Sequence, residues 1–216
     1  MKGFWGLLKT NFHLSIQNNL LLATLYLLIV PIMRGIENLD KVHSAQCLEQ
    51  SVIFIGILLI VPLYAAEQKR AIREVVLTRK IPQWTILFIR IVMAVIMLTF
   101  LTGVFAKIMI IKNCTFPYAS FVMGTVISEI VLGSMGLFAA VQSNSVIAGY
   151  LVSIGYFLFN YLGNISGTNI FCLFSMETDN FITKIWLLWI SILLITVTLL
   201  YVKKKSFLNN SLLPAK

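Results

Sequence analysis

Long apolar runs separated by short polar segments form the dominant pattern of the chain. The runs begin near residues 20, 51, 85, 116, 146 and 184, and few charged residues interrupt them. About 20 consecutive apolar residues can cross the hydrocarbon layer of a membrane as an α-helix. The pattern therefore predicts an all-α membrane protein with six transmembrane helices at residues 20–33, 51–66, 85–111, 116–141, 146–162 and 184–202. The first range is short, so we expect that helix to tilt or to extend at one end.

The first 18 residues have a different, amphipathic pattern. In a helix, their apolar side chains gather on one side and their polar side chains on the other. The apolar side holds Phe4, Trp5, Leu8, Phe12 and Ile16, and the polar side holds Lys2, Lys9, His13 and Gln17. Residues 1–18 are therefore predicted to form a helix in the membrane interface, with its aromatic side chains at headgroup depth. The alternative is an irregular lead-in to the first span.

Composition agrees with a membrane protein and limits the number of domains. Hydrophobic residues make up 59% of the 216 residues, and the mean hydropathy is +0.91, whereas soluble domains are about 45–50% apolar. No polar gap between the apolar runs is long enough for a soluble domain, which needs about 50 residues or more. Residues 1–216 are therefore predicted to form one transmembrane domain, and any ATPase or protease module would belong to another chain.

The distribution of basic residues predicts the orientation of the helices. The formal net charge is +9, and Lys and Arg gather on the cytoplasmic side of membrane proteins. With the N-terminus inside, the inner segments hold Lys2, Lys9, Lys69, Arg70, Arg73, Arg79, Lys80, Arg90, Lys203, Lys204, Lys205 and Lys216. The outer side then holds Arg34, Lys41, Lys107, Lys112 and Lys184. Both termini are therefore expected to be cytoplasmic, with polar outer segments at residues 34–50 and 163–183.

Three cysteines, Cys47, Cys114 and Cys172, all fall on the outer side of this topology. None of them has a spacing typical of a metal site, so no metal is expected. A disulfide between Cys47 and Cys114 is one interpretation. The other is that all three thiols are unpaired and pack as small apolar side chains.

A concentrated run of charge lies between the second and third apolar runs, at residues 67–82. Such a segment cannot remain in lipid and must lie at a membrane face. As a helix it would place Glu67, Ala71 and Glu74 on one face. Pro82 would end this helix, because the residue before a proline avoids the α conformation. One interpretation is a solvated connector whose positive charge sets the topology, and the other is a surface helix that a soluble partner binds.

The pattern of this stretch resembles the cytoplasmic loop of ABC-2 type transporter permeases. The residues that carry the resemblance are Glu67, Ala71, Glu74, Leu77 and Pro82, followed by Arg90 early in the next apolar run. The family also has an interfacial N-terminal helix, six spans and a short outer segment between the fifth and sixth, so the resemblance covers the whole chain. It departs in one place, because family members usually have a Gly-Thr pair where this chain has Ala71 and Ile72.

The resemblance implies that residues 67–82 form a coupling helix that docks on a separate ATP-binding cassette ATPase. Its coupling residues would be Glu67, Arg70, Ala71, Arg73, Glu74, Leu77 and Pro82. The chain has no G-x-x-x-x-G-K-S/T phosphate-binding loop, so it is not expected to be an enzyme, and the partner would bind ATP and Mg²⁺. Six spans are half of a usual pathway, which implies a homodimer or a heterodimer with a second permease.

Residues outside this stretch are candidates for a transport pathway or a dimer interface. Glu129 lies near the middle of the fourth apolar run, where a charge is costly. It is predicted either to serve the substrate pathway or to pack as a hydrogen-bonded carboxyl. Gly149 and Ser153 form a pair of small residues four positions apart, which suits either a dimer interface or packing within the chain.

The outer segment at residues 163–183 supplies the other pathway candidates. In ABC-2 permeases this region forms short re-entrant helices that close the outer end of the pathway. The resemblance therefore implies an apolar plug made by Phe171, Leu173 and Phe174. Asn160 and Tyr161 would lie beside it at the end of the fifth span. The alternative is an interfacial loop with an aromatic anchor.

These features predict the membrane subunit of an ATP-driven exporter in a bacterial cytoplasmic membrane. Its cargo would be amphiphilic or lipophilic, because the sequence shows no polar path beyond Glu129. The small size resembles permeases for antimicrobial-peptide export or immunity, which is an analogy alone. Two alternatives remain: a non-transporting membrane protein that binds a toxin, and an intramembrane peptidase, for which His13 and His43 would lie in different compartments.

Overall fold

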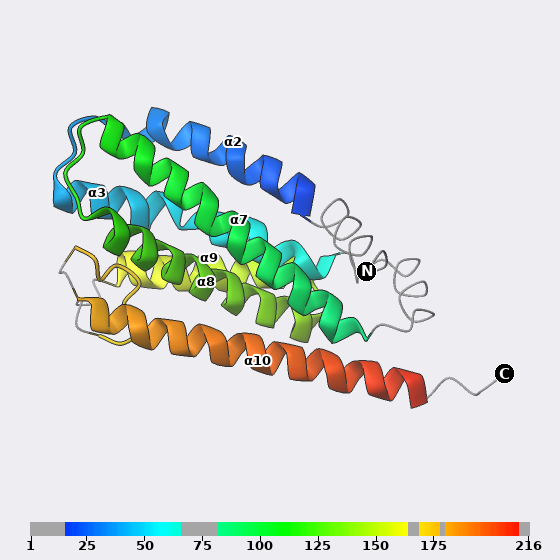
Figure 1. The fold of residues 1–216 in the computed structure, drawn as a ribbon. Helices are drawn as coiled ribbons and strands as arrows, with labels where there is room; N and C mark the ends of the chain where they lie inside the picture. The colour runs from blue at the N-terminus through cyan, green and yellow to red at the C-terminus, as the bar shows by residue number, and fades with distance from the viewer. Residues whose placement is uncertain (1–15, 66–81, 164–168, 178–179, 212–216) are drawn as a thin grey trace.

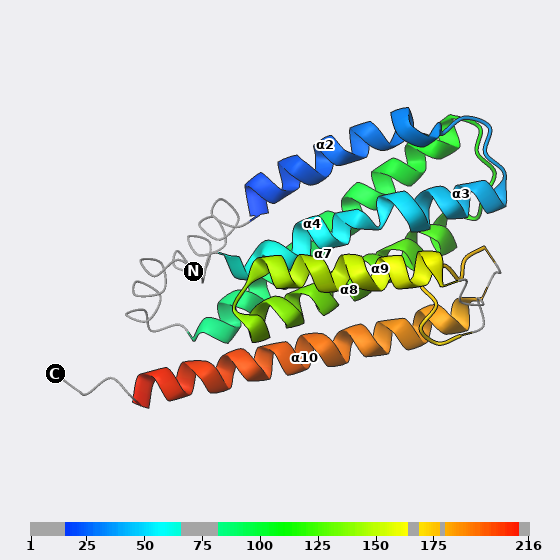
Figure 2. The same ribbon diagram turned by 180° about the vertical axis from the view of Figure 1, so that it is seen from behind.

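A computed structural model describes residues 16–65, 82–163, 169–177 and 180–211, with side chains up to residue 205. These residues form helices and turns, with no strand among them. The helices are α2 (Gln17–Arg34), α3 (Lys41–Cys47), η2 (Leu48–Val52), α4 (Phe54–Ile60), η3 (Val61–Tyr64), α7 (Gln83–Ile111), α8 (Tyr118–Ser143), α9 (Val146–Leu162) and α10 (Phe181–Ser211). They run lengthwise in one elongated bundle (Figure 1), which Figure 2 shows from behind. The predicted all-α architecture is confirmed for this part of the chain.

Four helical rods are long and apolar enough to cross a membrane. They are Lys41–Tyr64, Gln83–Ile111, Tyr118–Ser143 and Phe181–Lys205. The 17-residue helix α9 is a shorter apolar helix beside them. These lengths and compositions support a membrane protein. Six spans stay a prediction, and the interfacial helix at residues 1–18 falls mostly on residues 1–15, outside the described part of the chain.

The rod from Lys41 to Tyr64 corrects the predicted start of the second span. The sequence pattern places a polar loop at residues 34–50, but α3 already begins at Lys41. Asp40 caps this helix, because its carboxylate accepts a hydrogen bond from the backbone N–H of His43 at 3.0 Å. Ala45 and Leu48 then bury their side chains completely. The polar residues of this stretch therefore lie on a helix that also has a buried apolar face.

This rod changes helix type twice along its length. Leu48–Val52 form a π-helical turn, in which the N–H of Ile53 donates to the carbonyl of Leu48 at 3.3 Å. Val61–Tyr64 form a 3₁₀ turn that contains Pro62, a residue type that removes a backbone donor from a helix. Inserted π turns are frequent at functional sites, and Glu49 lies within this one.

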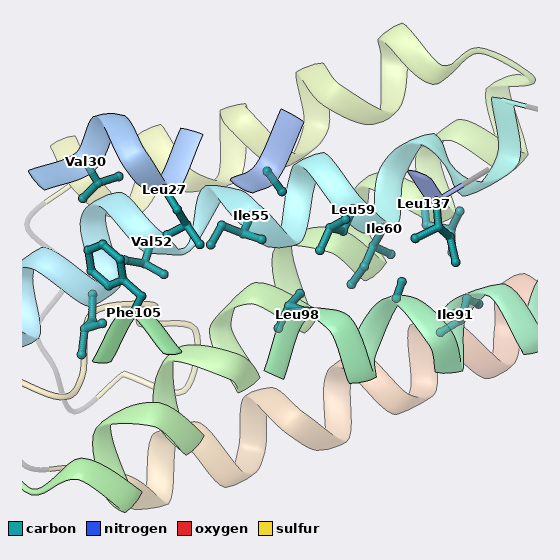
Figure 3. Packing of buried hydrophobic residues seen from close by; sticks show 14 of the residues in the cluster. Leu27, Val30, Val52, Ile55, Leu59, Ile60, Ile91, Leu98, Phe105 and Leu137 are labelled. Atoms are coloured by element: carbon teal, nitrogen blue, oxygen red, sulfur yellow. The ribbon is translucent and has the colours of Figure 1, made fainter. Parts of the chain in front are cut away.

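The main core forms around the same rod. Of its apolar segment 72% is buried inside the bundle, against 22% for α10, so the rod is central and α10 is peripheral. Apolar side chains from α2, α7 and α8 converge on it, as Figure 3 shows. The side chains labelled there are Leu27, Val30, Val52, Ile55, Leu59, Ile60, Ile91, Leu98, Phe105 and Leu137.

Apolar side chains also cover the outward faces of the bundle. On α10, Trp186, Trp189 and Leu193 are 52%, 62% and 61% exposed, and on α2 Ile32 is 83% exposed. Exposed apolar surface of this extent in water would be an aggregation liability. Its presence around the whole bundle therefore supports a lipid-facing surface.

Glycines allow α4, α8 and α9 to approach one another very closely. A Cβ atom on Gly56 of α4 would lie 2.2 Å from the backbone oxygen of Glu129 on α8. A Cβ atom on Gly136 of α8 would lie 2.2 Å from Ser153 Oγ on α9. Small residues are the usual means by which membrane helices reach such short separations, where backbone and side chains are in direct van der Waals contact.

One end of the bundle, which we call the Lys112 end, contains the turns at residues 35–40 and 112–117. The two turns are joined by hydrogen bonds from the N–H of Asn38 to the carbonyl of Lys112 and from the N–H of Thr115 to the carbonyl of Leu39, both at 3.0 Å. An ion pair between Glu37 and Lys112 lies on the surface beside them, at 2.6 Å. The topology predicted from charge makes this the outer end.

The opposite end, which we call the Lys203 end, contains the turn between α8 and α9 at Asn144. Basic residues near the end of α10 lie over aromatic rings here. Lys203 Nζ is 5.9 Å from the ring centre of Trp84, and Lys205 Nζ is 6.0 Å from that of Tyr64. Such contacts between cations and aromatic faces are favourable, and the predicted topology makes this the cytoplasmic end.

Candidate functional site

A buried ion pair lies near the Lys112 end, among helices that are otherwise apolar. Lys184 Nζ is 2.5 Å from Glu49 Oε1, and each side chain is only 1% exposed. Glu49 comes from η2, and Lys184 comes from the first turn of α10. The sequence pattern places Glu49 in an outer polar loop and Lys184 at the outer start of the sixth span. The structure corrects this assignment, because the two charges face each other inside the bundle.

Hydrogen bonds complete the surroundings of both charges. The ammonium group of Lys184 also donates to Ser128 Oγ on α8 and to the carbonyl of Leu173, both at 2.6 Å. The carboxylate of Glu49 accepts from the backbone N–H of Met176 at 3.2 and 3.3 Å. A buried ion pair is tolerated only when such bonds offset the desolvation of its charges. Lys184 has a further need for an anion, because a cation near a helix N-terminus is unfavourable.

The two backbone groups in this network belong to residues 169–177, which we call the cap segment. It connects toward α9 on one side and α10 on the other, and its described residues form turns without a helix. The short re-entrant helices that the resemblance implies are therefore absent from residues 169–177. Leu173 and Met176 are 0% and 2% exposed, whereas Phe171 is 58% exposed. The ring of Phe171 therefore lies at the surface while Leu173 is buried, and the apolar plug stays a prediction.

Side chains of α9 hold the backbone of the cap segment. Asn160 Oδ1 accepts a hydrogen bond from the N–H of Leu173 at 2.9 Å. The hydroxyl of Tyr156 donates to the carbonyl of Phe171 at 2.7 Å. Asn160 is itself oriented by donating to the carbonyl of Tyr156 at 3.0 Å. Asn160 therefore touches the segment that the sequence places beside it, through backbone bonds.

Aromatic rings join the same two elements. Phe174 of the cap segment packs edge-on against Phe157 and Tyr161 of α9, with ring centroids 5.6 and 6.4 Å apart. Tyr161 also stacks on Phe157 at 5.9 Å. Of the outer pathway candidates, Asn160, Tyr161 and Phe174 are thus brought together, while Phe171 contributes its carbonyl group and leaves its ring at the surface.

Glu129 is a second buried acidic residue, located in the middle of α8. Its side chain is fully buried, and both carboxyl oxygens accept from the hydroxyl of Thr102 on α7, at 2.9 and 3.1 Å. The sequence offers a pathway carboxylate or a hydrogen-bonded carboxyl packed against a neighbouring helix. The contact with Thr102 is that of a hydrogen-bonded carboxyl packed against a neighbouring helix. A hydrogen bond to a neighbour lowers the cost of burying such a group.

At the Lys203 end, polar contacts brace the two rods that flank residues 66–81. Arg90 of α7 is 3% exposed and donates through Nη1 to the carbonyl of Leu63 at 3.2 Å. The hydroxyl of Tyr64 donates to Asn144 Oδ1 at 3.1 Å, and Lys205 Nζ donates to the Tyr64 hydroxyl at 3.4 Å. The central rod, α7, the α8–α9 turn and α10 are therefore linked at this end.

Most of the predicted coupling residues lie outside the part of the chain that the structure describes. They are Glu67, Arg70, Ala71, Arg73, Glu74 and Leu77. Pro82 is described: it precedes α7 with an extended backbone, φ −66° and ψ 139°, and lies on the surface. It begins a new helix, as the sequence pattern requires, and the coupling helix stays a prediction.

The candidates for a dimer interface are used within the chain. A Cβ atom on Gly149 would lie 2.5 Å from the carbonyl oxygen of Gly136, and Ser153 Oγ donates to the carbonyl of Leu132 at 2.8 Å. Both residues are therefore buried between α9 and α8. The sequence allowed either a dimer interface or packing within the chain, and the structure shows Gly149 and Ser153 packed within the chain.

None of the three cysteines forms a disulfide, and all three are buried. This agrees with the interpretation of thiols that pack as small apolar side chains, rather than with a disulfide between Cys47 and Cys114. The thiol of Cys114 donates to the carbonyl of Ile36 at 3.2 Å. Burial raises the pKa of the Cys172 thiol, in the cap segment. Among the described residues no group of three His, Cys, Asp or Glu side chains could hold a metal ion.

The sequence reasoning missed Glu49 and Lys184 as partners. Each of these residues lies at the start of an apolar run, where a charged side chain is expected to extend to the water at the membrane interface. One signal was present: ionisable groups within membrane segments usually pair with one another.

Comparisons of the chain with protein-family models, with curated proteins and with solved structures found no match.

Proposed function

We propose that this protein is the permease subunit of an ATP-driven ABC exporter. The observation that carries the proposal is the bracing at the Lys203 end. In the sequence, the charged stretch at residues 67–82 connects the central rod to α7, and the hydrogen bond from Arg90 to the carbonyl of Leu63 joins these two rods. A force applied to the charged stretch would therefore move the central rod and α7 together, as rigid-body helix motion.

The same end offers a route by which that motion reaches other helices. Tyr64 is bonded to Asn144 in the α8–α9 turn and to Lys205 of α10. The polar groups that a cytosolic ATPase contacts would be Glu67, Arg70, Arg73 and Glu74, and the apolar ones Ile72, Val76 and Leu77. The ATPase would bind ATP and Mg²⁺, and this chain would hydrolyse nothing.

A complete pathway would need a second permease, either another copy of this chain or a sister chain. The cargo would be amphiphilic or lipophilic, because the lipid-facing surface is apolar and the buried polar groups described here pair with one another. An antimicrobial peptide fits that description, in export or in immunity. In this arrangement the protein resides in a bacterial cytoplasmic membrane with both termini in the cytosol.

The test is whether an ATPase remains attached through the charged stretch. Tagged full-length protein is extracted from its native membrane in mild detergent, and the Mg²⁺-dependent ATP hydrolysis of the eluate is measured. Glu67→Ala/Glu74→Ala is expected to lower that activity at least tenfold. The matched control is Glu37→Ala/Glu177→Ala, which removes two exposed acidic residues at the Lys112 end and is expected to retain the ATPase.

Mass spectrometry identifies whether the retained polypeptide has a phosphate-binding loop. Absence of any such polypeptide from the wild-type complex would contradict the proposal and favour a non-transporting membrane protein. Equal loss in both double variants would show that the charged stretch is not the attachment site.

A further inference from the structure

We propose that the Glu49–Lys184 ion pair is a latch that holds the cap segment, residues 169–177, closed over the Lys112 end of the bundle. The proposal concerns the fold of this chain alone. It does not depend on an ATPase or on transport.

The geometry supports a latch because one pair of charges reaches four parts of the chain. Glu49 belongs to the central rod and Lys184 to α10. Glu49 accepts from the backbone N–H of Met176, while Lys184 donates to the carbonyl of Leu173 and to Ser128 on α8. Apart from each other, the two charges therefore have three polar partners, and two of these are backbone groups of the cap segment, at the buried residues Leu173 and Met176.

The surface beneath the cap segment is shaped to receive it. A Cβ atom on Gly124 of α8 would lie 2.6 Å from Met176 Sδ, so the Met176 side chain lies directly on the glycine backbone. Ser128 is one turn further along the same helix and is also fully buried. Release of the cap segment would expose this strip of α8, which carries a hydroxyl and no bulky side chain.

Loss of one charge would shift the equilibrium between the docked and the released cap segment toward release. With Lys184 removed, the Glu49 carboxylate would remain buried without its cation, which strongly favours any arrangement that lets water reach it. The hydrogen bonds from α9, between Asn160 and Leu173 and between Tyr156 and Phe171, would remain. These neutral bonds are individually weaker than charge-assisted ones, so the ion pair dominates the closure.

The chain contains a native reporter for this motion. Cys172 lies in the cap segment and is 2% exposed. In a Cys47→Ala/Cys114→Ala background, Cys172 is the single thiol, and its rate of reaction with a maleimide reports opening. The protein is placed in lipid nanodiscs, where reagent reaches both faces, so the result does not depend on the predicted topology.

Glu49→Gln and Lys184→Met are each expected to raise the labelling rate of Cys172 at least tenfold. The double variant is expected to label no faster than the faster single variant, because both residues act through one contact and no unpaired charge is left buried. Glu37→Gln is the matched control, since it breaks an exposed ion pair at the same end, and it is expected to leave the rate unchanged.

A second reporter separates local release from unfolding. In a Cys47→Ala/Cys172→Ala background, Cys114 lies in the turn between α7 and α8 and is 6% exposed. Its labelling rate is expected to stay unchanged in Glu49→Gln and in Lys184→Met. An unchanged Cys172 rate, an equal rise at Cys114, or multiplied effects in the double variant would each overturn the latch.

Discussion

Replacement of Gly56 by alanine tests a direct backbone contact between α4 and α8. An alanine Cβ at this position would lie 2.2 Å from the backbone oxygen of Glu129, 2.6 Å from its carbonyl carbon and 2.7 Å from its Cα. All three atoms belong to the rigid backbone of α8, so no side chain can rotate away. Atoms in contact need about 3.5–4.0 Å, and α4 and α8 must therefore separate by about 1 Å.

The cost of this separation is set by two opposing effects. Forcing an extra methyl group into a packed core costs typically about 1–3 kcal/mol. Alanine in the middle of a helix is more favourable than glycine by about 0.5–1 kcal/mol. The net destabilisation expected for Gly56→Ala is therefore about 1–2 kcal/mol, which raises the unfolding equilibrium constant about 5–30-fold.

Gly155→Ala is the matched control for this experiment. Gly155 also lies within a helix, α9, but a Cβ atom there meets nothing within 4 Å. The helix-propensity gain is then unopposed, and Gly155→Ala is expected to stabilise the protein by about 0.5–1 kcal/mol. Both variants and the wild type are compared by equilibrium unfolding in mixed micelles of increasing SDS content, followed by far-UV circular dichroism.

The two glycine substitutions should thus shift the unfolding midpoint in opposite directions. A Gly56→Ala protein as stable as Gly155→Ala would refute the reasoning, because α4 and α8 could not then be in backbone contact at Glu129. A loss shared equally by both variants would also refute it, since only Gly56 has atoms of another helix close by.

Two further predictions concern Glu129 and Glu37. Thr102→Val removes the hydroxyl donor of the buried Glu129 carboxyl and should destabilise the protein by about 1–3 kcal/mol in the same SDS assay. Thr102→Val/Glu129→Met should recover most of that stability, because no unsatisfied polar group is left. A double variant less stable than Thr102→Val would contradict this. The hydrogen bond from Lys112 lowers the pKa of Glu37 below its ordinary value of 4.5, so the stabilisation by this pair should be complete above pH 4.5 and fade as the pH falls through the lowered pKa. Glu37→Gln should remove that pH-dependent part of thermal unfolding, and an unchanged pH profile in Glu37→Gln would count against the ion pair.

Helices and their order could be predicted because the apolar runs are long. The third, fourth and fifth predicted ranges agree with α7, α8 and α9 to within about two residues at each end, since Pro82, Pro117 and Ser145 precede the helix starts. The second range began ten residues too late, because the charges of Lys41 and Glu49 looked like a loop. In the structure this stretch is helical, and Asp40 caps its start by accepting a hydrogen bond from the N–H of His43.

The candidate site was less accessible to sequence reasoning for a geometric reason. Glu49 and Lys184 are 135 positions apart, and a single sequence does not reveal which charge finds which partner. Likewise, the spacing of Gly149 and Ser153 allows close contact with another helix, but it does not show whether the contacting helix belongs to the same chain. Their contacts with Gly136 and Leu132 answer this question.

Hydropathy along the chain was sufficient to establish an all-α protein suited to a bilayer, because helix formation in lipid depends on local composition and on hydrogen bonds within each segment. The pairing of buried charges, the folding of the cap segment onto Gly124 and the bracing of Leu63 by Arg90 depend on which helix faces lie together. Those contacts join residues far apart in the chain, and packing in three dimensions selects them.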